Sequence, residues 1–298
     1  MSAAGDVEAF FWIDNCDTAY LSEEMSGHGD VGMNISDHPE SELIGFEDPD
    51  HFEEKMREVA ERPEVSHSSQ LVWWLANETN TDDLGEIWDI ARDAQHPEDY
   101  GNGFEHFVRY MDERPVHTSV VTAAPDFPVE DALERRMNGY SPEVIGGKLK
   151  QNGSGIEVEA FCGGDEKAQR IRDEIGVDPD SVPGFAFGNT GGDRPMMEPA
   201  KESFGRDRAY DFATVYAEDS PDFWTHGALG VAAYALESGA DVDEAYEEII
   251  GFLASGLDRH GEVKLDEVED GGRESGPYTD QIINAYDRAV EEVEQWQI

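Results

Sequence analysis

Residues 186–197 read AFGNTGGDRPMM, and this stretch decides which fold the sequence predicts. It continues a short apolar run at 182–187 that is typical of a buried strand. A turn of small residues then presents Asn189 and Asp193, and Pro195 favours the start of a helix. A strand that delivers an amide and a carboxylate to its carboxyl end is suited to hold a cation.

Strand-like and helix-like segments alternate through the middle of the chain, after a first buried strand predicted at 7–13. The apolar patterns predict further strands at 116–123, 155–161, 182–187 and 210–217, with helices at 128–137 and 165–175 and a helical turn at 194–203. This rhythm is typical of α/β proteins in which helices cover both faces of a parallel sheet. Ligands of such proteins bind at the carboxyl ends of the strands.

Two further regions are predicted to be helical, one after the first strand and one at the end of the chain. In the region 21–113, helices are expected from Asp48-Pro49 through 60, at 68–76, from a cap at 81–83 through 94, and at 104–111. In the region after 220, helices are expected at 222–238, 242–256 and 278–296. Their apolar spacing suits helices that pack on a larger body.

The composition combines a full apolar core with an extremely acidic surface. The 298 residues carry a net charge of −47, from 68 acidic and 21 basic residues, while 38% are hydrophobic. Repulsion among so many carboxylates is screened at molar salt, where the Debye length is about 3 Å. We therefore expect the cytosolic protein of an extreme halophile, in which most acidic residues only solvate the surface.

The same composition excludes several classes of function. Binding to nucleic acid needs clustered Lys and Arg, and no basic patch is visible. No apolar run is long enough to span a membrane, and the N-terminus has no signal-peptide core. Two cysteines, Cys16 and Cys162, do not make a disulfide framework. We expect a cytoplasmic protein with neither a nucleic-acid nor a membrane partner.

Polar residues follow the predicted strands in an order that suits phosphoryl transfer. Asp14 follows the first strand, Thr122 ends the second, Lys167 opens the helix after the third, and Asn189 and Asp193 follow the fourth. A carboxylate can attack phosphorus, a divalent cation can draw off charge, and a hydroxyl and an ammonium can hold the phosphoryl oxygens. Each residue also has a structural alternative, as a turn former, a strand residue, a surface ion-pair partner or a helix cap.

In order and spacing, these residues resemble the haloacid dehalogenase-like (HAD) phosphohydrolases, especially the phosphoserine-phosphatase-like branch. The resemblance covers residues 7–20 and 116–200. It implies a three-layer α/β fold with a HAD-like (Rossmannoid) parallel sheet. The implied organisation is a core of residues 1–20 plus 115–220, an inserted helical cap at 21–114, and a helical C-terminal extension at 221–298.

The resemblance also assigns roles to the strand-end residues. It implies that Asp14 is the nucleophile and a Mg²⁺ ligand, and that Thr122 and Lys167 hold the phosphoryl group. Asn189 and Asp193 would complete the Mg²⁺ site.

The first motif departs from the family pattern D-x-D-G-T, because residues 14–18 read DNCDT. Cys16 stands where the family has its acid/base Asp, and Asp17 stands where it has Gly. Cys16 could still offer its backbone carbonyl to the metal. A thiol of ordinary pKa about 8.5 matches carboxylate chemistry poorly. A local shift could instead place Asp17 in the acid/base role.

These observations predict a Mg²⁺-dependent phosphatase that acts on a small phosphorylated metabolite through an aspartyl-phosphate. The alternative is a catalytically degenerate HAD-like protein that binds a ligand or another protein. A third class is an unrelated α/β protein, in which Asp14, Thr122, Lys167 and Asp193 would not converge. The sequence specifies neither the substrate nor the oligomeric state.

Overall fold

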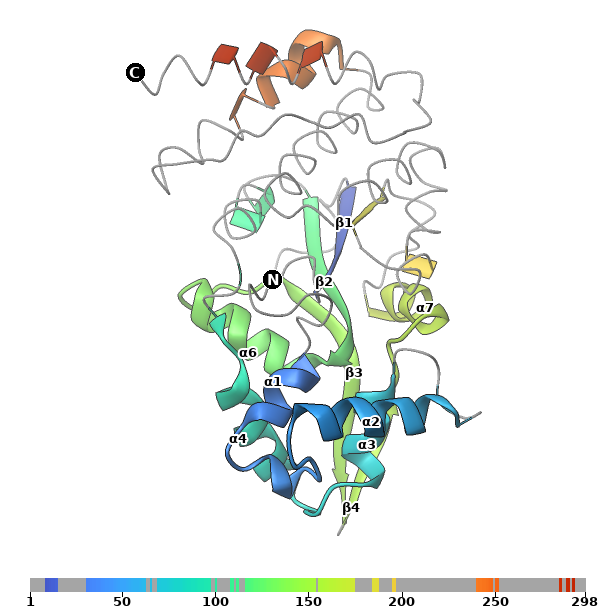
Figure 1. The fold of residues 1–298 in the computed structure, drawn as a ribbon. Helices are drawn as coiled ribbons and strands as arrows, with labels where there is room; N and C mark the ends of the chain where they lie inside the picture. The colour runs from blue at the N-terminus through green and yellow to red at the C-terminus, as the bar shows by residue number, and fades with distance from the viewer. Residues whose placement is uncertain are drawn as a thin grey trace.

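Figure 1 shows the computed structural model of the chain. It describes residues 9–15, 31–62, 65, 69–97, 100, 108–109, 111–112, 116–153, 155–174, 184–187, 195–196, 240–248, 250–251, 284–285, 288–289 and 291–292. The strand predicted at 210–217 and the helix predicted at 222–238 lie outside the described residues, as does most of the turn predicted at 194–203.

Five strands form one sheet in the order β4-β3-β2-β1-β5. They are β1 (Ala9–Asp14), β2 (Val116–Pro125), β3 (Glu143–Asn152), β4 (Gly155–Ala160) and β5 (Gly184–Phe187). β1 pairs in parallel with both β2 and β5, and β2 pairs in parallel with β3. β1 is apolar over four consecutive buried residues, as expected of a strand that is covered on both faces. The predicted α/β class and the parallel pairing are confirmed.

The sequence analysis missed β3 and assigned the wrong direction to β4. The strand predicted at 155–161 runs antiparallel to β3 at the edge of the sheet. β3 escaped notice because Gly146 and Gly147 interrupt its apolar pattern. A Cβ on Gly146 would lie 2.8 Å from the Cα of Asp126, and one on Gly147 would lie 2.5 Å from Cγ2 of Val72. Neighbouring elements approach β3 so closely that both positions require glycine. The same two glycines interrupt the apolar pattern by which the strand could have been predicted.

Two helices flank the sheet, with α6 (Asp126–Arg136) and α7 (Asp165–Glu174) on opposite sides of it in Figure 1. α6 buries Val129 and Leu133, and α7 buries Ile171 and Lys167. Both helices confirm the helices predicted at 128–137 and 165–175. The sheet and these two helices make the three layers of the fold.

The helices between β1 and β2 gather around the far end of the β3–β4 hairpin in Figure 1. They are α1 (Val31–Asp37), the 3₁₀ helix η1 (Ser41–Leu43), α2 (Pro49–Ala60), α3 (Gln70–Asn77) and α4 (Leu84–Ala94). Asp48 caps α2 by accepting from the backbone N–H of His51 at 2.8 Å, and Asp83 caps α4 by accepting from that of Gly85 at 2.8 Å. The helices predicted to start at Asp48-Pro49 and at the 81–83 cap are confirmed.

Gln151 joins this helical region to the tip of the β3–β4 hairpin. Its Oε1 accepts from the backbone N–H of Leu84 at 2.9 Å, and its Nε2 donates to the carbonyl oxygen of Asp82 at 2.8 Å. The amide thus satisfies backbone groups at the start of α4, where a helix has no partners of its own.

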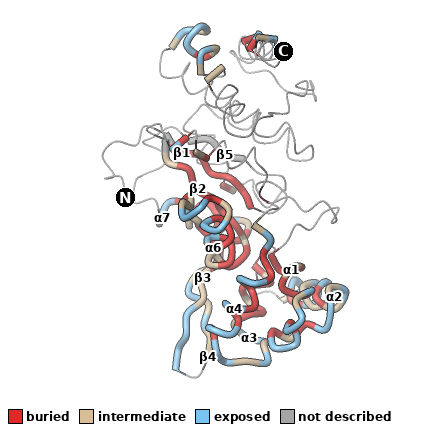
Figure 2. The backbone as a smooth tube through the Cα atoms, turned by 90° about the vertical axis from the view of Figure 1, so that its left-hand side faces the viewer, coloured by how far each residue is buried: buried red, intermediate tan, exposed pale blue. Residues whose placement is uncertain are grey.

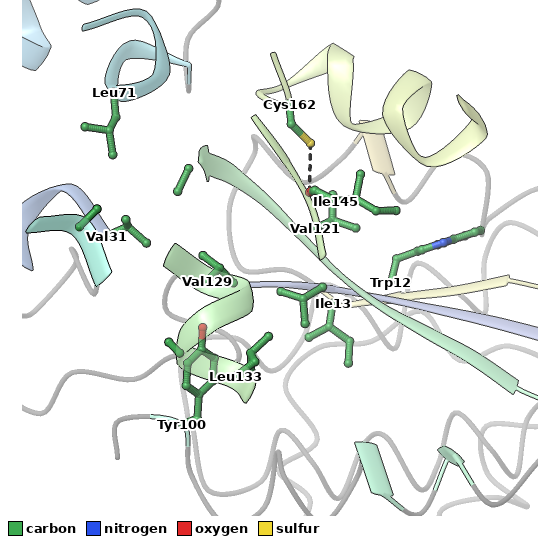
Figure 3. Close-up of a cluster of buried hydrophobic side chains, with 14 of the residues drawn as sticks. Trp12, Ile13, Val31, Leu71, Tyr100, Val121, Val129, Leu133, Ile145 and Cys162 are labelled. Carbon is green, nitrogen blue, oxygen red and sulfur yellow. Dashed lines mark hydrogen bonds between the residues drawn. The ribbon is translucent and has the colours of Figure 1, made fainter. Parts of the chain in front are cut away.

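The buried apolar side chains of the sheet and of the surrounding helices form one hydrophobic cluster. Figure 2 colours the backbone of buried residues red. Figure 3 shows part of it, where Ile13 of β1 shares the cluster with Val129 and Leu133 of α6. The division into core, cap and C-terminal extension remains a prediction. Near the C-terminus, residues 242–248 are helical, in agreement with the predicted helix at 242–256. Among the described residues, no helix is long and apolar enough to cross a membrane.

Candidate active site

A buried ion pair lies at the carboxyl end of β1. The ammonium of Lys167 donates to Oδ1 of Asp14 at 2.6 Å, although the two residues are 153 positions apart in sequence. Only 8% of the Asp14 side chain and 4% of the Lys167 side chain are exposed. Removing two charges from water costs several kcal/mol per ion, so such a pair is weak evidence for a stabilising role. Its place at the end of a central parallel strand is where α/β proteins bind ligands.

The turn before α7 delivers Lys167 to this position. Gly164 has φ +53°, in the left-handed region that glycine adopts without strain. The carbonyl oxygens of Gly163 and Gly164 accept from the backbone N–H groups of Glu166 and Lys167, each at 3.1 Å. The tight turn lets α7 begin directly beside the sheet, with Lys167 on its buried face.

Thr122 lies at the same edge of the sheet, on the strand next to β1. The register pairs Asp14 with Val121, so Thr122 is one residue farther along β2. The residue is fully buried, and its Oγ1 accepts from the backbone N–H of Ala124 at 3.1 Å. A hydroxyl that accepts through a lone pair keeps its own proton to donate.

One part of the chain matches a known protein family. A family model described as haloacid dehalogenase-like hydrolase matches residues 55–198. The matched span runs from α2 through β5 and includes Thr122 and Lys167, while Asp14 precedes it. The matched part of the chain is therefore HAD-like. The parallel strands β3, β2, β1 and β5, with helices on both faces, form a HAD-like (Rossmannoid) sheet.

The chain is also similar to a solved structure titled "Phospho-Aspartyl Intermediate Analogue of Phosphoserine phosphatase". The similarity covers 65% of this chain and 84% of the other, with a TM-score of 0.39 and 13% sequence identity. No curated protein matches the chain.

The structure brings together only part of the site that the HAD resemblance implies. Asp14 and Lys167 are in contact, and Thr122 lies on the neighbouring strand. Cys16, Asp17, Asn189 and Asp193 lie outside the described residues. In the described part of the chain, no group of three or more His, Cys, Asp or Glu side chains could hold a metal ion.

Positive charge extends from Lys167 along the buried face of α7. Arg170, one turn farther, donates from Nη2 to the carbonyl oxygen of Gly146 at 3.4 Å and pairs with Glu174 at 2.8 Å. The Cys162 thiol lies in the field of both cations, yet burial dominates and raises its pKa to about 12. Its Sγ donates to the carbonyl oxygen of Ile145 at 3.4 Å (Figure 3). Cys162 therefore stays protonated at neutral pH and is no nucleophile.

Sequence reasoning missed one polar contact beside Asp14. The hydroxyl of Tyr100 donates to Oδ1 of Asn15 at 2.7 Å, and both residues are buried. Tyr100 lies 85 residues away in sequence, beyond α4, so no local pattern could pair the two. The available signal was Asn15 itself, because a polar residue that directly continues a buried apolar strand needs a hydrogen-bond partner.

Proposed function

We propose that the protein is a Mg²⁺-dependent phosphatase that hydrolyses a small phosphorylated metabolite through an aspartyl-phosphate. The observation that carries the proposal is the buried contact between Asp14 and Lys167 at the carboxyl end of β1. The match of residues 55–198 to the HAD-like hydrolase model and the position of Thr122 support the same reaction class.

In the proposed reaction, a carboxylate oxygen of Asp14 attacks the phosphorus atom of a phosphomonoester. The new bond joins Asp14 to phosphorus, while the bond from phosphorus to the ester oxygen breaks and that oxygen takes up a proton. Water then attacks the phosphorus of the aspartyl-phosphate, releasing inorganic phosphate and restoring the carboxylate. Lys167 orients the carboxylate and offsets negative charge on the phosphoryl group, and Thr122 donates to one of its oxygens.

The residues proposed for the metal are Asp14, Asn189 and Asp193. Asp14 fits a hard cation such as Mg²⁺, because its carboxylate oxygens are donors of the kind that Mg²⁺ prefers, and Asn189 and Asp193 would add oxygens of the same kind. Bound Mg²⁺ supplies positive charge that stabilises the developing charge on the phosphoryl oxygens.

The proton for the leaving oxygen is assigned to Asp17 or Cys16, since both follow Asp14 in the first motif. Cys16 also supports a second candidate function. If no group replaces the acid/base Asp, the protein would be a catalytically degenerate HAD protein that binds a ligand or another protein without turnover.

The test is phosphate release from a panel of phosphomonoesters, with Mg²⁺ and molar KCl to screen the surface carboxylates. The wild type should turn over at least one member, and Asp14→Asn should abolish that turnover. Asp126→Asn is the matched control, because Asp126 also follows a strand of the sheet, is half-buried and lies outside the proposed machinery. It should retain activity. A folded wild type without turnover across the panel would reject catalysis and favour the binding protein.

A further inference from the structure

The residue directly after Asp14 is held by a side chain from a distant segment of the chain. Asn15 is 0% exposed and Tyr100 is 1% exposed, and the Tyr100 hydroxyl donates to the Asn15 amide oxygen at 2.7 Å. A buried amide or hydroxyl without a hydrogen bond destabilises a fold, so each group needs such a contact. An apolar residue at position 15 would avoid this requirement altogether.

The position of Tyr100 makes this contact rigid. Tyr100 is among the largest fully buried side chains of the described residues. Its ring belongs to the same hydrophobic cluster as Ile13, Val129 and Leu133, which Figure 3 draws with it. A ring that is packed on all sides has little rotamer freedom, so its hydroxyl is a fixed donor.

Two distant elements therefore hold successive residues at the end of β1. Lys167 at the start of α7 binds the carboxylate of Asp14, and Tyr100 from beyond α4 binds the amide of Asn15. Asp14 is the last residue of β1 and Asn15 is the first residue of the turn after it, so the two contacts restrain the backbone at the point where the strand ends.

We infer that Tyr100 is a positioning residue for Asp14 and acts through Asn15. The catalytic part of this inference rests on the proposed phosphatase function. The Tyr100 hydroxyl fixes Asn15, and Asn15 fixes the peptide that carries the Asp14 carboxylate toward the phosphorus atom. Misplacement of a reacting group by about 1 Å can lower a rate about 100-fold. Loss of the hydroxyl should therefore lower kcat and leave KM nearly unchanged, because Tyr100 need not touch the substrate.

The first experiment measures kcat and KM for Tyr100→Phe, Asn15→Ala and the double variant, with Tyr140→Phe as the matched control. Tyr140 is a partly buried tyrosine whose hydroxyl bonds to Asp112 instead. We expect kcat of Tyr100→Phe to fall roughly tenfold, with KM within about twofold of wild type. In the Asn15→Ala background, Tyr100→Phe should have no further effect, since the two residues act as one unit. A fall in kcat no larger than that of Tyr140→Phe, or a full additional fall in the double variant, would overturn the inference.

The second experiment keeps the inference testable if the wild type has no phosphatase activity, in which case the proposed function fails by itself. Amide hydrogen exchange is measured on wild type, Tyr100→Phe and Tyr140→Phe, at a temperature at which all three are folded. Exchange in a peptide that covers residues 10–15 should accelerate in Tyr100→Phe alone, while peptides of α2 stay unchanged. Equal exchange of the 10–15 peptide in all three proteins would refute the positioning role. Equal acceleration in every peptide would refute it too, because that pattern reports global destabilisation.

Discussion

Lys167→Met tests whether the ion pair with Asp14 is as buried as its geometry indicates. Methionine keeps much of the length and volume of lysine but removes the charge, leaving the Asp14 carboxylate, now 8% exposed, without its cation. Breaking one half of a buried pair typically costs about 3–5 kcal/mol. Protonation of Asp14 sets an upper limit on this loss, because a neutral carboxyl no longer needs a cation. Neutralising a carboxyl of ordinary pKa about 3.9 at pH 7 costs about 4 kcal/mol. The free energy of unfolding should therefore fall by about 3–4 kcal/mol.

The loss should shrink as the pH falls. At pH 5, neutralising such a carboxyl costs only about 1.5 kcal/mol, so Asp14 without the Lys167 ammonium can take up a proton at smaller cost. The sign follows from the burial of an unpaired carboxylate, which favours the protonated form in the folded state. Stability of the variant relative to wild type is thus lowest at neutral pH and recovers toward pH 5.

Denaturant unfolding in molar KCl, followed by circular dichroism at pH 7 and pH 5, measures these differences. Lys148→Met is the matched control, because Lys148 pairs with Glu174 at 2.9 Å with 34% and 29% of the side chains exposed. Partly exposed pairs contribute about 0–1 kcal/mol. The double variant Asp14→Asn/Lys167→Met should regain most of the lost stability, because no charge is left unpaired. A loss for Lys167→Met within about 1 kcal/mol of that for Lys148→Met at pH 7, or a loss independent of pH, would refute the reasoning.

Two further predictions concern other parts of the molecule. Gly147→Ala should lower the free energy of unfolding by about 1–3 kcal/mol, because its Cβ would lie 2.5 Å from Cγ2 of Val72; denaturant unfolding should show a much smaller effect for Gly155→Ala, whose Cβ meets nothing within 4 Å. Burial raises the pKa of Cys162 to about 12 in the folded protein, so the thiol ionises at lower pH in the unfolded chain than in the folded one. The free energy of unfolding should therefore fall as pH rises from about 9 to 12. Cys162→Ala should show a smaller fall in unfolding titrations over this range, and an equal fall in both proteins would contradict the assignment.

The sequence predicted those elements whose signals are local. The apolar run of β1, the Asp48-Pro49 start of α2 and the helix carrying Lys167 all have patterns that span a few residues. β3 could not be recognised in this way, because two of its residues are glycines. They are required by the close approach of Asp126 and Val72, which belong to other elements. Local pattern carries no information about such tertiary contacts.

In the candidate site, too, positions with a local sequence pattern could be predicted and tertiary contacts could not. The strand-end position of Asp14 and the helix-start position of Lys167 could be predicted, because the ends of parallel strands meet at one edge of the sheet. Thr122 does lie on the strand next to β1, but β2 continues past it to Pro125, so its predicted place at the end of that strand is wrong. The contact between Tyr100 and Asn15 could not, because the position of Tyr100 depends on how the segment after α4 packs on the core. Cys162 had no sequence signal for its buried position beside the two cations of α7.

The most direct test of the central claim is to trap the phosphoryl group on Asp14. The wild type is mixed with a phosphomonoester that it turns over, Mg²⁺ and molar KCl, quenched in acid within one turnover, and digested for mass spectrometry. We predict that the peptide containing Asp14 carries the mass of one phosphoryl group, and that the same peptide of Asp126→Asn carries it as well. Release of phosphate in the same samples without any phosphoryl group on that peptide would contradict Asp14 as the nucleophile.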